Sequence, residues 1–97
     1  MDFPISSEEP VITTSYVTDD RLPILYVSHD RDDEAQSGGS WQFHCGNNDY
    51  SESRLRLVGL GAILLLDPSI RQLADLPIGY GAHRVAPNGP WEYRKEA

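Results

Sequence analysis

The chain has 97 residues, a net charge of −7 at pH 7 and a hydrophobic content of 39%. That length suits a single domain, and the composition is that of a globular protein rather than of a disordered one. The excess of negative charge repels phosphate backbones and anionic lipids, so neither nucleic acid nor a membrane is expected as a partner.

The sequence also carries information on the cell compartment. The longest apolar run, residues 62–66, is much shorter than the roughly 20 residues that cross a bilayer. The first residues, MDFPISSEEP, carry acids where a secretory signal carries bases, and one cysteine cannot form an internal disulfide. We therefore expect a cytoplasmic protein.

The charge is unevenly distributed along the chain. Residues 1–50 hold ten acids and two bases, whereas residues 51–97 hold five acids and six bases. An acidic surface attracts a basic partner and speeds its association, although acidic loops also serve simply to keep a small protein in solution.

The first half of the chain predicts an arm and three strands. Residues 1–10, with two prolines, are expected to form a flexible N-terminal arm, and residues 11–97 a single domain. Residues 11–17 are rich in β-branched side chains and predict a strand, and a second strand is expected over residues 24–28. Residues 41–45 alternate between apolar and polar and predict a third, half-buried strand. That strand would place Trp41, Phe43 and Cys45 on one face, with Gln42 and His44 on the other.

The second half predicts two helices followed by two strands. Residues 60–66 are expected to form a short buried helix that Gly59 caps, and Asp67-Pro68 predicts the start of a second one. Residues 78–85 and 91–95 flank an Asn-Gly pair, which favours a hairpin. The expected fold is α+β, with a mostly antiparallel sheet of about five strands and two short helices between the third and fourth strands.

The segment HDRDDEAQSGGSWQFHC, residues 29–45, is the first candidate for a site. Counted from Asp30, an EF-hand needs glycine at the sixth position and glutamate at the twelfth, but Ala35 and Trp41 occupy these positions. A looser cation site in the acidic loop remains an alternative. The preferred interpretation is an acidic loop that leads into a core strand.

The same segment is a weak candidate for zinc or for thiol catalysis. His44 and Cys45 are neighbours on a predicted strand, so their side chains point to opposite faces, and His29 would be a third ligand of four. A catalytic thiolate needs an electropositive setting, whereas Cys45 lies in the acidic half on an apolar face. No metal site, cofactor or catalytic residue is predicted.

Two further patterns lie in the second half. Residues 59–64 begin like a dinucleotide fingerprint but lack its third glycine and the βαβ unit around it. Arg84, on a predicted strand face with Tyr80 and Ala82, could anchor a carboxylate of a partner, or form an internal ion pair or aromatic stack. Gly79 and Gly81 leave the other face of that strand bare, and Trp91 or Tyr93 could cover them.

Three stretches together resemble a known family. They are PILYV at residues 23–27, WQF at residues 41–43, and the run from Leu57 to Trp91 that includes DPSI, LADLPIG and AHR. Over residues 10–95 the chain resembles a small bacterial domain family grouped with the type-33-like immunity proteins of polymorphic toxin systems. The resemblance implies a protein that neutralises a cognate toxin by binding it, and it carries over no catalytic residues.

The functional expectation is therefore a non-enzymatic binding protein, an immunity-type inhibitor that occludes a basic toxin partner. The residues expected to bind that partner are Asp30, Asp32, Asp33, Glu34 and Arg84. The alternative is a structural or regulatory interaction domain without a toxin, and a third interpretation is a metal-binding or hydrolytic protein that uses the acidic loop with His29 and His44.

Overall fold

The protein folds around one six-stranded sheet with the strand order β4-β1-β3-β2-β5-β6. The computed structural model describes residues 3, 6–30, 40–47, 49 and 51–96. The elements are β1 (Pro10–Thr14), α1 (Ser15–Thr18), β2 (Tyr26–Asp30), β3 (Ser40–His44), η1 (Glu52–Arg54), β4 (Leu55–Gly59), α2 (Leu60–Leu66), η2 (Pro68–Leu73), β5 (Tyr80–His83) and β6 (Glu92–Lys95).

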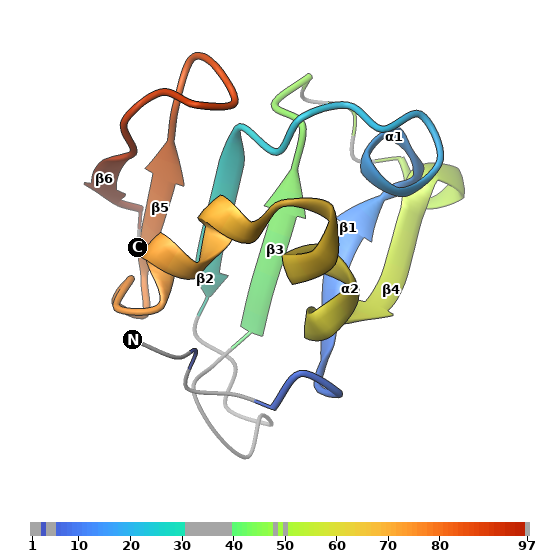
Figure 1. Ribbon diagram of the computed structural model, residues 1–97, viewed down its shortest axis with the longest axis horizontal. Helices are drawn as coiled ribbons and strands as arrows, with labels where there is room; N and C mark the ends of the chain where they lie inside the picture. Colours follow the sequence, from blue (N-terminus) through green and yellow to red (C-terminus); the bar gives the residue numbers. More distant parts are fainter. Residues whose placement is uncertain (1–2, 4–5, 31–39, 48, 50, 97) are drawn as a thin grey trace.

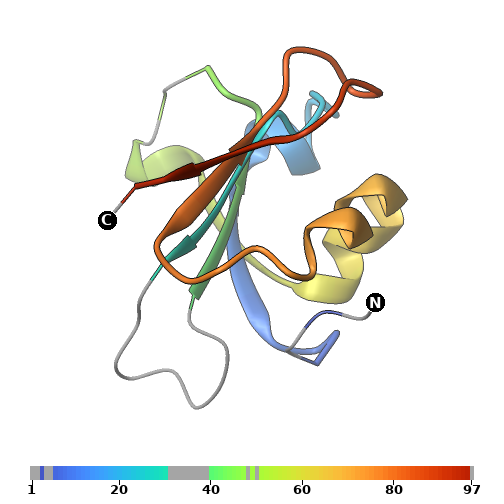
Figure 2. The same ribbon diagram turned by 90° about the vertical axis from the view of Figure 1, so that its left-hand side faces the viewer.

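The sheet is mixed but mostly antiparallel, because only β1 and β3 run in parallel. In Figure 1 its strands run from β6 on the left to β4 on the right, with α2 and η2 in front. Figure 2 shows the sheet edge-on, with α2 and η2 on one side only. We call the opposite side of the sheet the open face.

The hydrophobic core lies between the sheet and the α2–η2 layer. Trp41, Phe43 and Val27 contribute from the central strands and are at most 1% exposed. The helical layer buries Leu60, Ile63, Ile70, Leu73 and Leu76 against them. Burying each of these side chains contributes about 1.5 to 3 kcal/mol, so this contact is the main source of stability.

The expected α+β class and mostly antiparallel sheet are confirmed, but the count of about five strands is wrong. The additional strand, β4, pairs with β1 at the sheet edge and precedes α2. The two helices therefore lie between β4 and β5, whereas they were expected directly after the third strand. The strand expected over residues 11–17 is also too long, because β1 ends at Thr14 and α1 follows it.

The α2 helix was expected to be buried, and this is only partly correct. Leu60 and Ile63 are buried, whereas Leu65 is 86% exposed. The helix begins after Gly59, as expected, and the chain just before β1 satisfies its first amides: Gly61 N–H donates to Ser7 O at 2.8 Å. A Cβ on Gly61 would lie 3.3 Å from Ser7 Cβ, so this glycine permits close packing against the expected N-terminal arm.

The start of η2 and the C-terminal hairpin agree with the sequence prediction. The carboxylate of Asp67 accepts a hydrogen bond from Ser69 N–H at 3.0 Å, and η2 buries Ile70 and Leu73 completely. β5 and β6 pair antiparallel across the Asn88-Gly89 turn region. The faces expected for β3 are also correct, since Trp41 and Phe43 lie in the core.

Candidate functional site

The open face carries polar and ionisable side chains from three adjacent strands. Tyr26, Ser28 and Asp30 alternate along β2 with the buried Val27, so they point away from the helical layer. The register places His44 of β3 and His83 of β5 on either side of Tyr26, and Gln42 beside Ser28. Strand order thus gathers residues that are up to 57 positions apart in the sequence.

Five of these side chains line a depression of about 330 Å³ on the open face: Tyr26, Ser28, Asp30, Gln42 and His44. The Ser28 hydroxyl and the Gln42 amide both donate to Oδ2 of Asp30, at 3.1 and 2.9 Å. Nε2 of His44 contacts Oε1 of Gln42 at 3.0 Å, in the tautomer that donates to it. The depression is therefore a pre-arranged polar surface rather than a set of loose surface chains.

Burial and the neighbouring Asp30 have opposite effects on the protonation of His44. Burial lowers the pKa of His44, and the negative charge of Asp30 opposes this by raising it. His44 therefore favours its neutral form, in which it can both donate and accept one hydrogen bond.

Glu96 extends the polar array beside the depression. Its carboxylate lies over Gly81, where an added Cβ would meet Oε1 at 2.2 Å. Tyr26 donates to the same oxygen at 2.6 Å, and Nε2 of His83 lies 3.5 Å from Oε2. Burial and then the Glu96 carboxylate raise the pKa of Tyr26, so this phenol stays protonated as a donor.

The cover over Gly81 corrects one sequence expectation. Trp91 or Tyr93 was expected there, but Glu96 occupies the space. Tyr93 pairs with Ala82, on the helical side of the sheet, and its hydroxyl donates to Asp75 at 2.8 Å. The bare face of β5 thus accommodates a carboxylate rather than an aromatic ring.

Of the residues expected to bind a partner, Asp30 lies in the depression, whereas Asp32, Asp33 and Glu34 lie outside the described residues. Arg84 has a different environment. Its side chain is 1% exposed, pairs with Asp67 at 2.6 Å, and stacks over Trp91 at 4.1 Å. Nε and Nη1 donate to Ile24 O and Ser69 Oγ, both at 3.0 Å, so the guanidinium makes the internal ion pair and aromatic stack that were the alternative to partner binding.

The structure separates the proposed metal ligands. Nδ1 of His29 contacts Leu76 O at 2.6 Å, and its ring stacks on Trp41, on the helical side of the sheet. His44 lies on the open face, and Cys45 belongs to the hydrophobic core. Across the described part of the chain, no group of three or more His, Cys, Asp or Glu residues could hold a metal ion.

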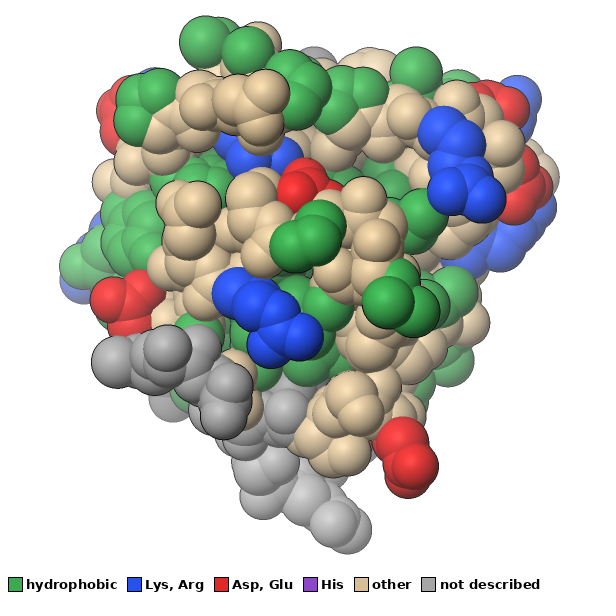
Figure 3. All heavy atoms as spheres, viewed as in Figure 1, with side chains coloured by type: hydrophobic (Ala, Val, Ile, Leu, Met, Phe, Trp, Pro, Cys, Tyr) green, Lys and Arg blue, Asp and Glu red, His purple; other side chains and the backbone are tan. Residues whose placement is uncertain are grey.

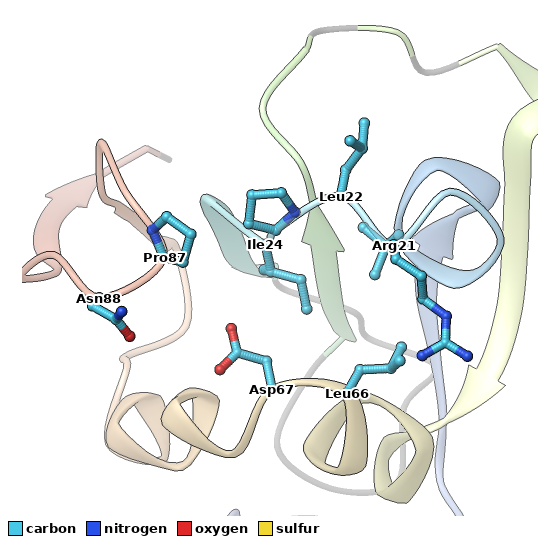
Figure 4. Close-up of a pocket in the computed structure, with 9 residues that line it drawn as sticks. Arg21, Leu22, Ile24, Leu66, Asp67, Pro87 and Asn88 are labelled. Carbon is cyan, nitrogen blue, oxygen red and sulfur yellow. The ribbon is translucent and has the colours of Figure 1, made fainter.

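A second cavity, of about 330 Å³, opens at the junction of α2 and η2. The Asp67 carboxylate points into it between Ile24 and Pro87 (Figure 4), but this acid is already paired with Arg84. Arg21, at the side of the cleft, has a φ of 58°, an uncommon backbone conformation for a residue other than glycine. The other residues that line this cavity are mainly apolar: Val17, Leu22, Pro23 and Leu66, together with Asn88.

On the helix-covered face, acidic and basic side chains are scattered among hydrophobic and polar atoms (Figure 3). The acidic run in the sequence points to Asp30, but it does not identify Tyr26, Ser28, Gln42 and Glu96 as members of one surface. Polar residues at every second position of residues 26–30 were the available signal.

Comparisons with known proteins return no relative. No family model, no curated protein and no solved structure matches this chain. In the described residues, no helix is long and apolar enough to cross a membrane.

Proposed function

We propose that this chain is a non-enzymatic cytoplasmic protein that binds a basic protein partner through the open face and the acidic residues that follow β2 in the sequence. The observation that carries the proposal is the depression around Asp30, whose lining contains a carboxylate and several other hydrogen-bond acceptors. It lies on the side of the sheet opposite α2 and η2 (Figure 2). A charge of −7 favours encounter with a basic partner over encounter with nucleic acid.

The acidic character continues in the sequence after β2. Asp30 ends the strand and is followed by Asp32, Asp33 and Glu34. On the same face, β6 adds Glu92, whose carboxylate pairs with Arg94 at 3.1 Å, so Glu92 contributes less free charge than Asp30. Recognition is therefore proposed to centre on the Asp30 end of the sheet.

The immunity-type role is the specific form of this proposal, and its support is the sequence resemblance described above. An inhibitor of a cationic toxin would use its acidic surface to reach the site at which that toxin attracts its own substrate. A regulatory partner that is unrelated to toxins would use the same surface, and the identity of the bound protein would distinguish the two roles.

The test compares three forms of the tagged protein as bait in lysate of the source organism. The first is wild type, and the second neutralises Asp30, Asp32, Asp33 and Glu34 to Asn or Gln. The third is a matched control that neutralises four exposed acids elsewhere, namely Glu8, Glu9, Asp19 and Glu52. Both variants change the net charge equally, so only the place of the charge differs.

We expect wild type and the control to retain the same basic protein at about 0.1 M salt. Both should lose it when the salt concentration is raised, because salt screens the attraction between the charges. The variant neutralised at Asp30, Asp32, Asp33 and Glu34 should retain little of this protein. Its association rate with the purified partner should be lower than that of wild type and less sensitive to salt. Equal retention by both variants would refute the proposed surface, and failure of wild type to retain any basic protein would refute the function.

A further inference from the structure

We propose that the depression lined by Tyr26, Ser28, Asp30, Gln42 and His44 receives an arginine side chain of the protein partner. This inference rests on the proposed function and specifies the chemistry by which the open face would recognise its partner. The volume of about 330 Å³ and the shallow, open form of the depression suit one side chain that enters from solvent.

Asp30 has acceptor capacity left for a cation. Both hydrogen bonds that it receives, from Ser28 and Gln42, come from neutral groups and reach the same oxygen, Oδ2. Among the described residues, none donates to Oδ1. A carboxylate can accept about four hydrogen bonds, so a cationic donor can bind here without displacing either neighbour.

The Asp30 carboxylate is held in place before any partner arrives. Gln42 is itself fixed by His44 at 3.0 Å, and Asp30 is fixed by both Ser28 and Gln42. A fixed acceptor loses little side-chain entropy when the partner binds, and this is the cost that makes most exposed ion pairs weak.

The surroundings of Asp30 favour a cationic and planar ligand. Glu96 lies over Gly81, which pairs directly with Ser28, so a second carboxylate lies next to the depression. An anion would be repelled from both sides, whereas a cation would gain from both. A guanidinium is planar and offers five donors, so it can bond to Asp30 while it also donates to the Ser28 hydroxyl or to Glu96. A lysine ammonium is a compact and more strongly hydrated charge, and it matches this spread of acceptors less well.

The experiment uses the full chain and small probes of defined charge. Heteronuclear NMR follows its backbone amides during titration with N-acetyl-arginine amide, with the lysine analogue, and with the citrulline analogue, which keeps the shape of arginine without its charge. Each titration is repeated on Asp30→Asn and on Glu92→Gln, an equal charge change on the same face but outside the depression.

We expect saturable shifts with the arginine probe at residues 26, 28, 42 and 44, with weaker binding of the lysine probe and no localised shifts with citrulline. Asp30→Asn keeps the shape of the side chain but removes its charge and replaces one acceptor oxygen by an NH2 donor, so it should weaken arginine binding by about fivefold or more. Glu92→Gln should change it by less than about twofold. The dispersion of the amide resonances in each variant reports whether it is folded.

Three results would overturn the inference: shifts that are absent or spread over the surface, equal binding of citrulline or lysine, or no loss in Asp30→Asn. The capture experiment remains independent of these. Two further baits separate the depression from the acidic run: one neutralises Asp30 alone, and the other neutralises Asp32, Asp33 and Glu34. Loss of the basic partner only in the second bait would place recognition outside the depression, and it would refute the arginine site while the proposed function stands. Arginine binding without any captured partner would support the cation site and refute the proposed function.

Discussion

Replacing Arg84 by methionine tests whether the link between the sheet and η2 stabilises the fold. Arg84 lies just after β5, and its guanidinium contacts Asp67 and Ser69 at the start of η2 as well as the main chain at Ile24. Methionine retains an apolar stem that can pack on Trp91 but removes the charge and the three hydrogen bonds to Ile24, Ser69 and Asp67. The substitution therefore leaves the Asp67 carboxylate without its cation.

The expected cost follows from the burial of the pair. Breaking a buried ion pair by removing one partner costs about 3 to 5 kcal/mol. The side chain of Asp67 is 22% exposed, so water relieves part of that cost, while Ile24 O loses its donor at about 1 kcal/mol. We expect a loss of about 3 kcal/mol, a large fraction of the roughly 5 to 15 kcal/mol that stabilises a domain of this kind.

Urea unfolding followed by far-ultraviolet circular dichroism measures this loss. With a urea dependence of about 1 to 1.5 kcal/mol per molar, the midpoint should fall by about 2 to 3 M. Arg71→Met, at an exposed arginine of η2, is the control and should change the free energy of unfolding by less than about 0.5 kcal/mol. A loss below about 1 kcal/mol in Arg84→Met, or costs that simply add when Arg84→Met and Asp67→Asn are combined, would refute this reasoning.

Three further predictions concern packing and ionisation. Ile63→Ala should cost about 2 to 5 kcal/mol in urea unfolding, whereas Leu65→Ala on the exposed side of the same helix should cost less than about 0.5 kcal/mol; similar costs would show that α2 does not pack as described. NMR titration should give His44 a pKa below its ordinary 6.5. The unfolded chain then binds more protons than the folded one, so the free energy of unfolding should fall as pH drops below 6.5, and His44→Gln should weaken this trend. Burial, followed by the Asp75 carboxylate, raises the pKa of Tyr93 to about 12, so the stability that this tyrosine contributes is full below about pH 10 and is lost as pH rises toward 12. Ultraviolet absorbance titration of Asp75→Asn should show a lower pKa for Tyr93, and an unchanged titration would contradict the assigned cause.

The parts of the fold that sequence predicted correctly are those in which pattern and burial agree. In β3, apolar and polar residues alternate, and Trp41 and Phe43 do face the core. At Asp67-Pro68, capping chemistry is local, so the helix start needs no knowledge of distant residues. Strand alternation and helix capping can be predicted from sequence because the residues that cause them lie within the element itself.

β4 was missed because its two leucines, Leu55 and Leu57, do not face the core. Leu57 is 71% exposed and lies opposite Ile12 on the open side of the sheet, and Leu55 is also exposed. A hydrophobic pattern predicts which side of a strand is buried, and this prediction fails for an edge strand whose leucines face solvent. For α1, the β-branched residues of the preceding strand continue into Val17, so composition alone gave no sign that the strand ends at Thr14.

The open face could not have been assembled from sequence, because its members meet only through the order β3-β2-β5. Gln42 and Ser28 become neighbours by strand pairing, and Glu96 reaches Tyr26 only because Gly81 leaves space above β5. Neither relation is visible in the spacing of the residues along the chain. The acidic run was visible, but it identified only one of the side chains that line the depression.

The two faces of the sheet differ in burial, and this difference determines whether a substitution alters stability or binding. The helical face contains the large buried side chains, so changes there alter stability first and binding only as a consequence. Asp30 is only partly buried, and its hydrogen bonds come from neighbours on its own face, so Asp30→Asn should leave the core packing intact. A loss of arginine binding in a variant with unchanged unfolding therefore identifies recognition, whereas the same loss in an unstable variant would not.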